Sequence, residues 1–249
     1  MDRELAELRR MLDEAARVVV FSGAGISTES GIPDFRSPGG VWTRMKPIYF
    51  QEFVASETAR VEAWRRRFES DPVMRVAAPN RGHRAVAALV GLGKVSHVVT
   101  QNIDGLHQAS GIAAHQVIEL HGNSTYATCL DCARRYEIED LRAGFEASLR
   151  APRCDDCGGL VKTATVAFGQ SMPAGAMIRA EEAILGCDLC LVVGSSLVVY
   201  PAAGFPELAK RRGAGLVILN REATEMDAIA DLVLHREIGD ALGAVVGNN

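Results

Sequence analysis

Short apolar runs, rich in β-branched residues, recur along the chain, and most of them end at a small or polar residue. The main runs are Val18–Phe21, Val95–Thr100, Leu189–Val193, Leu216–Leu219 and a shorter one at Asp231–His235. A continuous apolar run is typical of a strand buried on both faces of a parallel sheet. Helical spacing predicts helices over 3–16, 83–92 and 202–211, and one more at the C-terminus. Strands and helices that alternate predict an α/β fold, a Rossmann-like parallel sheet with helices on both faces.

Two stretches break this alternation. Residues 32–79 carry aromatic residues and prolines without a clear strand, and residues 126–162 hold four of the six cysteines. We expect one catalytic unit over 1–249, with a large Rossmann-like domain formed by 1–31, 80–125 and 163–249. A helical insertion at 32–79 and a metal-binding insertion at 126–162 would then form a smaller domain.

Small and polar residues follow the predicted strands. They are Gly23-Ala24-Gly25, Gln101-Asn102-Ile103-Asp104, Gly194-Ser195-Ser196 and Asn220. In open α/β sheets, ligands bind beyond the carboxyl ends of the strands, so these residues predict a binding crevice. A strand that leads through Gly-x-Gly into a helix typically directs backbone N–H groups at a phosphate.

The continuation of this glycine loop disfavours a hydride-transfer enzyme. A dehydrogenase fingerprint needs a third glycine and, about 20 residues on, an acidic residue that closes a second strand. Here Thr28 stands at the third glycine position, and Pro33 breaks the chain before any second strand. Residues 41–55 supply no strand with a terminal carboxylate.

Composition and charge indicate in which cell compartment the protein lies and which partners it lacks. The formal net charge of −4 gives no general attraction to nucleic acid or to an anionic membrane. The N-terminus lacks the basic-then-apolar order of a secretory signal, and the apolar runs are too short to span a bilayer. We therefore expect a cytoplasmic protein, in which cysteines are metal ligands or core thiols rather than disulfides.

Four cysteines form two C-x2-C pairs, Cys129 with Cys132 and Cys154 with Cys157. Four thiolates in this spacing are typical of one tetrahedral structural zinc ion without an open coordination position; the alternative is unmetallated surface thiols. Cys187 and Cys190 repeat the spacing, but they flank the start of a buried strand, so we interpret them as core thiols.

His121 is the candidate general base. It directly follows the apolar run Val117–Leu120, beside the strand that ends at Asn102 and Asp104. A lone histidine is more often a structural residue, but a neutral imidazole at a crevice can accept a proton near pH 7.

Taken together, these motifs resemble the sirtuins of the bacterial and archaeal type, which are NAD-dependent protein-lysine deacylases. The resemblance runs in order over about residues 15–225 and rests on 23–27, 31–36, 100–107, His121-Gly122, the two cysteine pairs and 194–197. It implies that an acyl group passes from lysine to ADP-ribose, which gives nicotinamide, O-acetyl-ADP-ribose and free lysine. NAD would be consumed as a co-substrate, a zinc ion would hold structure, and acyl-lysine proteins or peptides would be the partners.

The resemblance also implies residue roles. His121 would be the base that takes a proton from a ribose hydroxyl, with Asn102 and Asp104 as further catalytic residues. NAD would be held by Gly23, Ala24, Gly25, Thr28, Phe35, Arg36, Gln101, Ile103, Asp104, His121, Gly194, Ser195, Ser196, Asn220, Arg221 and Ile238. The acyl-lysine peptide would lie as an added strand against Val166, Phe168, Gly169 and Val198.

Some positions depart from the common family pattern, and other functions stay open. Ala167 and Gln170 differ near the expected peptide groove, and Trp64–Arg67 lacks the tyrosine of the pair typical of sirtuins that remove acidic acyl groups. We therefore expect an apolar acyl group, acetyl first.

Alternative functions are removal of longer acyl groups, mono-ADP-ribosyl transfer, and nucleic-acid binding by a zinc ribbon. Residues 129–162 hold six Lys/Arg against seven Asp/Glu, so no nucleic-acid partner is expected. No membrane partner is expected either, and the oligomeric state stays open, a monomer being compatible with the sequence.

Overall fold

The computed structural model describes residues 2–34, 40, 43 and 45–247. Its larger sheet has six parallel strands in the order β3-β2-β1-β7-β8-β9. These strands are β1 Val18–Ser22, β2 Val95–Thr100, β3 Val117–Glu119, β7 Leu189–Val193, β8 Gly215–Leu219 and β9 Leu232–Leu234. All five residues of β1 and of β7 are buried, which explains why these runs are apolar without alternation.

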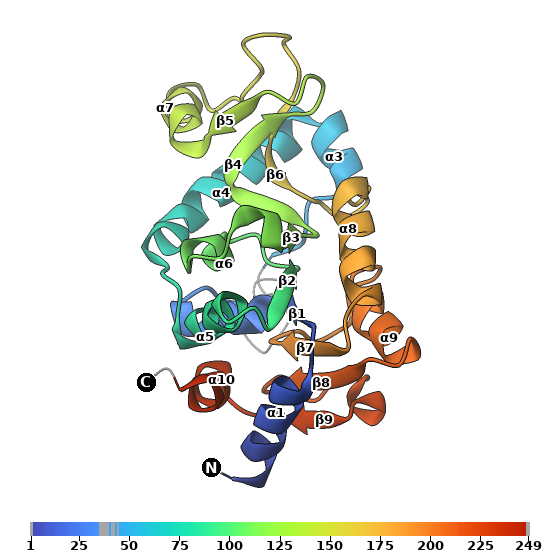
Figure 1. Ribbon diagram of the computed structural model, residues 1–249. Coiled ribbons are helices and arrows are strands. Elements are labelled where there is room, and N and C mark those ends of the chain that lie inside the picture. Colours follow the sequence, from blue (N-terminus) through green and yellow to red (C-terminus); the bar gives the residue numbers. More distant parts are fainter. Residues whose placement is uncertain (1, 35–39, 41–42, 44, 248–249) are drawn as a thin grey trace.

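Helices cover both faces of this sheet, as the sequence predicted (Figure 1). Val18 and Val20 pack toward α1 Arg3–Glu14, α5 Arg81–Gly91 and α10 Ile238–Val246. Val19 and Phe21 point to the opposite face, where α8 Ala174–Leu185 and α9 Gly204–Arg211 lie. The alternate residues of one strand therefore belong to two separate cores.

The second sheet has three antiparallel strands in the order β5-β4-β6. They are β4 Gly122–Cys129, β5 Arg135–Glu137 and β6 Val161–Thr165, and α3 Phe50–Ala55, α4 Glu57–Val76 and α7 Ile138–Ser148 lie around them (Figure 1). Trp64 and Phe68 of α4 pack with Phe145 of α7 in a third core. The indole Nε1 of Trp64 donates to the carbonyl of Val161 at 3.2 Å, so this core joins the helical and the cysteine-bearing insertions.

The described part of the chain also has four short elements: η1 Ala24–Ser30, α6 Leu106–Ala109, η2 Ala114–Gln116 and η3 Asp227–Ile229. The second sheet begins at Gly122, four positions before the boundary expected at 126. The division of the chain into a large and a small domain stays a prediction. Within the described residues, every helix is too short or too polar to cross a bilayer.

Candidate active site at the carboxyl edge of the large sheet

The loops after β1 and β7 pack against each other through glycines. A Cβ added to Gly25 would lie 2.7 Å from Gly194 Cα, and one added to Gly23 would lie 2.7 Å from the Gly194 carbonyl oxygen. Gly194 itself has a φ of +64°, which favours glycine. The amides of Gly23 and Gly25 donate to Val193 and Gly194, so these two N–H groups are not free for a phosphate. These glycines therefore allow the two loops to approach closely.

The loop 101–104 after β2 is held from several elements. Gln101 Nε2 donates to Ser195 Oγ at 2.8 Å, which joins this loop to the one after β7. Asn102 is buried, and its side-chain amide donates to Ser27 Oγ at 3.1 Å. Ser27 Oγ in turn donates to an Asp104 carboxylate oxygen at 2.7 Å. Asn102 and Asp104 are thus fixed around one hydroxyl of η1, and Gln101 is fixed by the loop after β7.

His121 lies between the two sheets. Its Nδ1 is 3.0 Å from the Gln101 carbonyl oxygen, and a carbonyl only accepts, so Nδ1 carries the proton. Nε2 then has the free lone pair, and it has no hydrogen-bond partner in the part of the chain that the structure describes. The backbone carbonyl of His121 accepts from the Val166 amide at 2.8 Å. Burial lowers the pKa of His121 below the usual 6.5, against an opposing effect of the Gln101 carbonyl, so the ring is neutral at pH 7.

Two further histidines lie behind the loop 101–104. His107 Nε2 is 2.8 Å from Ser22 Oγ, and Ser22 donates to Thr100 at 2.8 Å. The His107 ring meets the His83 ring edge to face at 5.2 Å between centroids. Burial lowers the pKa of His107 to about 3 and that of His83 to about 4, so both rings are neutral at pH 7.

The remaining predicted NAD contacts are spread along the same edge. Thr28 Oγ1 donates to the Gly25 carbonyl at 2.9 Å, and Asn220 Nδ2 donates to the Glu222 carbonyl at 2.7 Å. Arg221 is exposed and lies 3.7 Å from Glu237. The side chain of Ile238 is buried in the core, at the start of α10. Phe35 and Arg36 lie outside the described residues.

Of the predicted peptide contacts, Val166 lies directly beside His121, since its amide donates to the His121 carbonyl. Phe168 and Val198 are exposed apolar side chains, at 38% and 41% of their surface. The Phe168 ring packs against Tyr49 with centroids 6.0 Å apart, and the Phe168 carbonyl accepts from the Phe50 amide at 2.9 Å. The segment after β6 is therefore held to α3 on one side and to His121 on the other.

The four cysteines of the two C-x2-C pairs converge, and their sulfur atoms all lie within 4.8 Å of one another. Cys129 and Cys157 are 3.5 Å apart, and Cys132 and Cys154 are 3.6 Å apart. A zinc tetrahedron with Zn–S bonds of about 2.3 Å has S–S edges of about 3.8 Å, so the residues fit a zinc ion. A Cβ at Gly159 would lie 2.8 Å from Cys129 Sγ, which explains the glycine after the second pair. Cys190 is fully buried and Cys187 packs against the same core, as predicted.

The donor set at the large-sheet edge fits NAD. Amides, hydroxyls and one carboxylate are the groups that bind ribose hydroxyls and a carboxamide, and His121 supplies a neutral base. Sequence reasoning missed two groups that hold these residues: Ser27, which contacts Asn102 and Asp104, and Ser124, which contacts Ile103. Ser27 stands in the quoted glycine motif, which was a usable signal. Ser124 carried none, because its role arises only from a contact between elements.

Comparison with known proteins identifies the family. A sequence model of the Sir2 family matches residues 23–201, which is most of the chain. The chain therefore belongs to the Sir2 family, the sirtuins.

Individual relatives match over nearly their whole length. An NAD-dependent protein deacetylase of Rhodopseudomonas palustris is 59% identical over 97% of this chain and 96% of its own. One named NAD-dependent protein deacetylase 1, of Bradyrhizobium diazoefficiens, is 58% identical over 96% and 93%. A solved structure of Sir2 with a p53 peptide and NAD+ has a TM-score of 0.89 at 37% identity and covers 99% and 98% of the two chains.

Proposed function

We propose that this protein is an NAD-dependent protein-lysine deacetylase with its active site at His121. The observation that carries the proposal is the position of this neutral imidazole, with Nδ1 bound to Gln101 and Nε2 free, beside the loop 101–104. Relatives at 58–59% identity that bear the name NAD-dependent protein deacetylase support it. The protein would convert acetyl-lysine, NAD and water into lysine, nicotinamide and O-acetyl-ADP-ribose.

When bound, NAD supplies a glycosidic bond whose cleavage lets the acetyl oxygen attack the ribose carbon. Gln101, Asn102, Ile103 and Asp104 surround the nicotinamide and its ribose, as the resemblance implies, and Ser27 fixes the side chains of Asn102 and Asp104. His121 Nε2 accepts a proton from a ribose hydroxyl, because Nδ1 is already protonated. The other NAD contacts expected from the sequence stay part of this proposal, Phe35 and Arg36 among them.

The peptide side of the proposal rests on the segment after β6. Val166, Phe168, Gly169 and Val198 would receive an extended acetyl-lysine peptide, and exposed Phe168 and Val198 would contact its apolar groups. We also propose acetyl as the preferred acyl group. The three arginines at 65–67 are each paired with a carboxylate, and Trp64 is buried. None of these four side chains is therefore placed to recognise an acidic acyl group.

A structural zinc ion held by Cys129, Cys132, Cys154 and Cys157 would fix the second sheet. A cytoplasmic location is part of the proposal, supported by cysteines that form a four-sulfur cluster and a pair of core thiols rather than disulfides.

One assay tests the function. The protein is incubated with an acetyl-lysine peptide with and without NAD, and free lysine peptide, nicotinamide and O-acetyl-ADP-ribose are measured. All three products should form in equal amounts and only with NAD. His121→Ala should lower the deacetylation rate by about 10²- to 10⁴-fold, the usual value of a general base. Wild-type protein that releases no lysine peptide, or unchanged deacetylation in His121→Ala, would contradict the proposal. A succinyl-lysine peptide tests the acyl preference, and it should react far more slowly than the acetyl peptide.

A further inference from the structure

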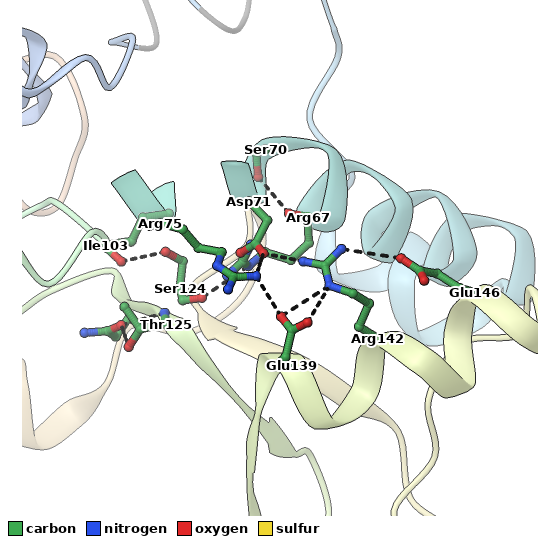
Figure 2. Close-up of polar contacts among 11 residues, drawn as sticks. Arg67, Ser70, Asp71, Arg75, Ile103, Ser124, Thr125, Glu139, Arg142 and Glu146 are labelled. Atoms are coloured by element: carbon green, nitrogen blue, oxygen red, sulfur yellow. Dashed lines mark hydrogen bonds and ion pairs between the residues drawn. The ribbon is translucent and has the colours of Figure 1, made fainter. Parts of the chain in front are cut away.

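Six charged side chains gather where α4 meets α7 (Figure 2). They are Arg67, Asp71, Arg75, Glu139, Arg142 and Glu146. Three positive and three negative charges balance in this cluster. A cavity of about 340 Å³ lies beside it, lined by Asp71, Pro72, Arg75, Val76 and Arg142. None of the residues expected to bind NAD or peptide belongs to this cluster.

Asp71 is the centre of the cluster. Its side chain is only 5% exposed, and Arg67 Nη1 donates to one carboxylate oxygen at 2.7 Å. Arg142 of α7 donates to the other oxygen, and Arg75 lies 3.8 Å from it. Arg67 is 11% exposed, so it forms with Asp71 a buried ion pair that is costly to break from one side.

Arg67 also connects Asp71 to the loop 101–104 through hydrogen bonds (Figure 2). Its Nε donates to the Ser124 carbonyl at 3.2 Å. The Ser124 amide and hydroxyl both donate to the Ile103 carbonyl, each at 2.8 Å. Hydrogen bonds therefore run without interruption from Arg142 on α7 through Asp71, Arg67 and Ser124 to Ile103.

Ile103 differs from Gln101 and Asp104 because its hydrogen-bond partner belongs to the second sheet and not to the large one. Gln101 is held by Ser195 and Asp104 by Ser27, and both serines belong to loops of the large sheet. The Ile103 carbonyl is held by Ser124 of β4, in the second sheet. A shift of Ser124 would thus twist the loop about its middle while its other contacts stay in place.

We propose that Arg67 and Asp71 are positioning residues for the nicotinamide side of the NAD site. This inference rests on the proposed function, in which Ile103 and Asp104 line that side. Through Ser124, the buried ion pair sets the orientation of the Ile103 carbonyl and so the shape of the pocket that holds the nicotinamide ring. The segment after β6 is held by the His121 carbonyl and the Phe50 amide, neither of which belongs to this series of hydrogen bonds.

The test is the KM for NAD and the Ki for nicotinamide as an inhibitor of deacetylation. Arg67→Gln should raise both by roughly tenfold, because a charged hydrogen bond in a buried site is lost. Ser124→Ala keeps the amide contact and should raise both by a smaller factor. The double variant should fall short of the product of the two single effects, since both act through Ile103. The KM for the acetyl peptide should stay within about twofold of wild type, because the peptide site loses no contact.

Arg75→Gln is the matched control. Arg75 contacts the same Asp71, but it is 63% exposed and does not touch Ser124, so both constants should stay at the wild-type value. Arg67→Lys keeps the charge near Asp71 but loses the guanidinium Nε. It should restore the melting temperature without restoring the nicotinamide Ki, which separates positioning from stability.

Unchanged KM and Ki in folded, zinc-loaded Arg67→Gln and Ser124→Ala would overturn the inference, even if their stability fell. If Arg67→Gln does not fold, Ser124→Ala alone decides by the same two constants. Wild-type protein without NAD-dependent deacetylation would instead overturn the proposed function, so the two failures are distinct.

Discussion

The ring of His121 is fixed by one backbone carbonyl, and this contact decides which nitrogen can accept a proton. Because Nδ1 donates to Gln101, Nε2 is the basic atom without any carboxylate partner. A carboxylate there would raise the pKa of the ring, whereas burial lowers it. Desolvation thus keeps the His121 imidazole neutral.

This lowered pKa predicts the pH dependence of deacetylation. Only the neutral ring acts as a base, so activity is lost as pH falls through the pKa of His121. Since that pKa lies below 6.5, the midpoint of the decline in kcat/KM should lie below pH 6.5. Rates measured from pH 5 to 8.5 with an acetyl-lysine peptide test this. A decline centred above pH 6.5 would contradict it.

Much of the site could be predicted from single residues and their place in the chain. His121 and the loop 101–104 follow apolar runs, and polar groups at the ends of parallel strands meet at one edge. Ser124 and Arg67 could not be found in this way. Arg67 contacts Ser124, and Ser124 contacts Ile103, only because α4, β4 and the loop 101–104 pack together, and no spacing along the chain records these two contacts.

At the scale of elements, continuous apolar runs predicted the strands of the large sheet well. The helix α4 lies inside the helical insertion predicted at 32–79, but its bounds were not predicted, because its buried positions are Arg60, Trp64, Phe68 and Asp71. Their spacing is helical, but two of the four are charged, so a search for apolar periodicity passes over them. The second sheet was missed for a related reason, since β4 is short of large apolar residues.

Because the loops after β1 and β7 are in close contact, one added methyl group should strongly affect stability and NAD binding. Gly25→Ala would place a Cβ 2.7 Å from Gly194 Cα, so the loops must separate. We expect a loss of about 1–3 kcal/mol in unfolding free energy and weaker NAD binding. Urea unfolding and calorimetric titration with NAD measure these changes.

Gly175→Ala is the control for this prediction. It lies in α8 with nothing within 4 Å of an added Cβ, so stability should hold or rise slightly. Equal effects of the two substitutions would show that the loop contact is unimportant.

Zinc removal should loosen the third core. Cys129 and Cys154 belong to the same core as Trp64, which is 1% exposed. In a Trp42→Phe background, a chelator should shift the emission of Trp64 to longer wavelength and lower the melting temperature. One zinc ion per chain should be released. Cys187→Ser should retain the zinc, and a chelated protein with unchanged emission would contradict this role of the site.

At the scale of the whole molecule, buried neutral histidines predict acid sensitivity. The pKa values of His83 and His107 are lowered to about 4 and about 3, below the unfolded value of 6.5. The unfolded chain therefore binds more protons below pH 6.5, and stability present above that pH is lost as pH falls toward 4. Each histidine should contribute a loss of about 2 kcal/mol between pH 6.5 and pH 5.

Urea unfolding at pH 7.5, 6 and 5 measures this dependence. His83→Gln should reduce the slope of stability against pH, whereas substitution of exposed His115 should leave it unchanged. A slope that is the same in both variants would exclude His83 as a source.

The strand order of the large sheet also has a consequence for synthesis on the ribosome. β1 lies between β2 and β7, but β7 begins only at Leu189. At about 5–20 residues per second, one edge of β1 stays unpaired for roughly ten to thirty seconds after it is made. During that interval the nascent chain presents an apolar strand edge to other chains. Chains that stop before Leu189 should therefore aggregate, and the complete protein should depend on chaperones that shield this edge.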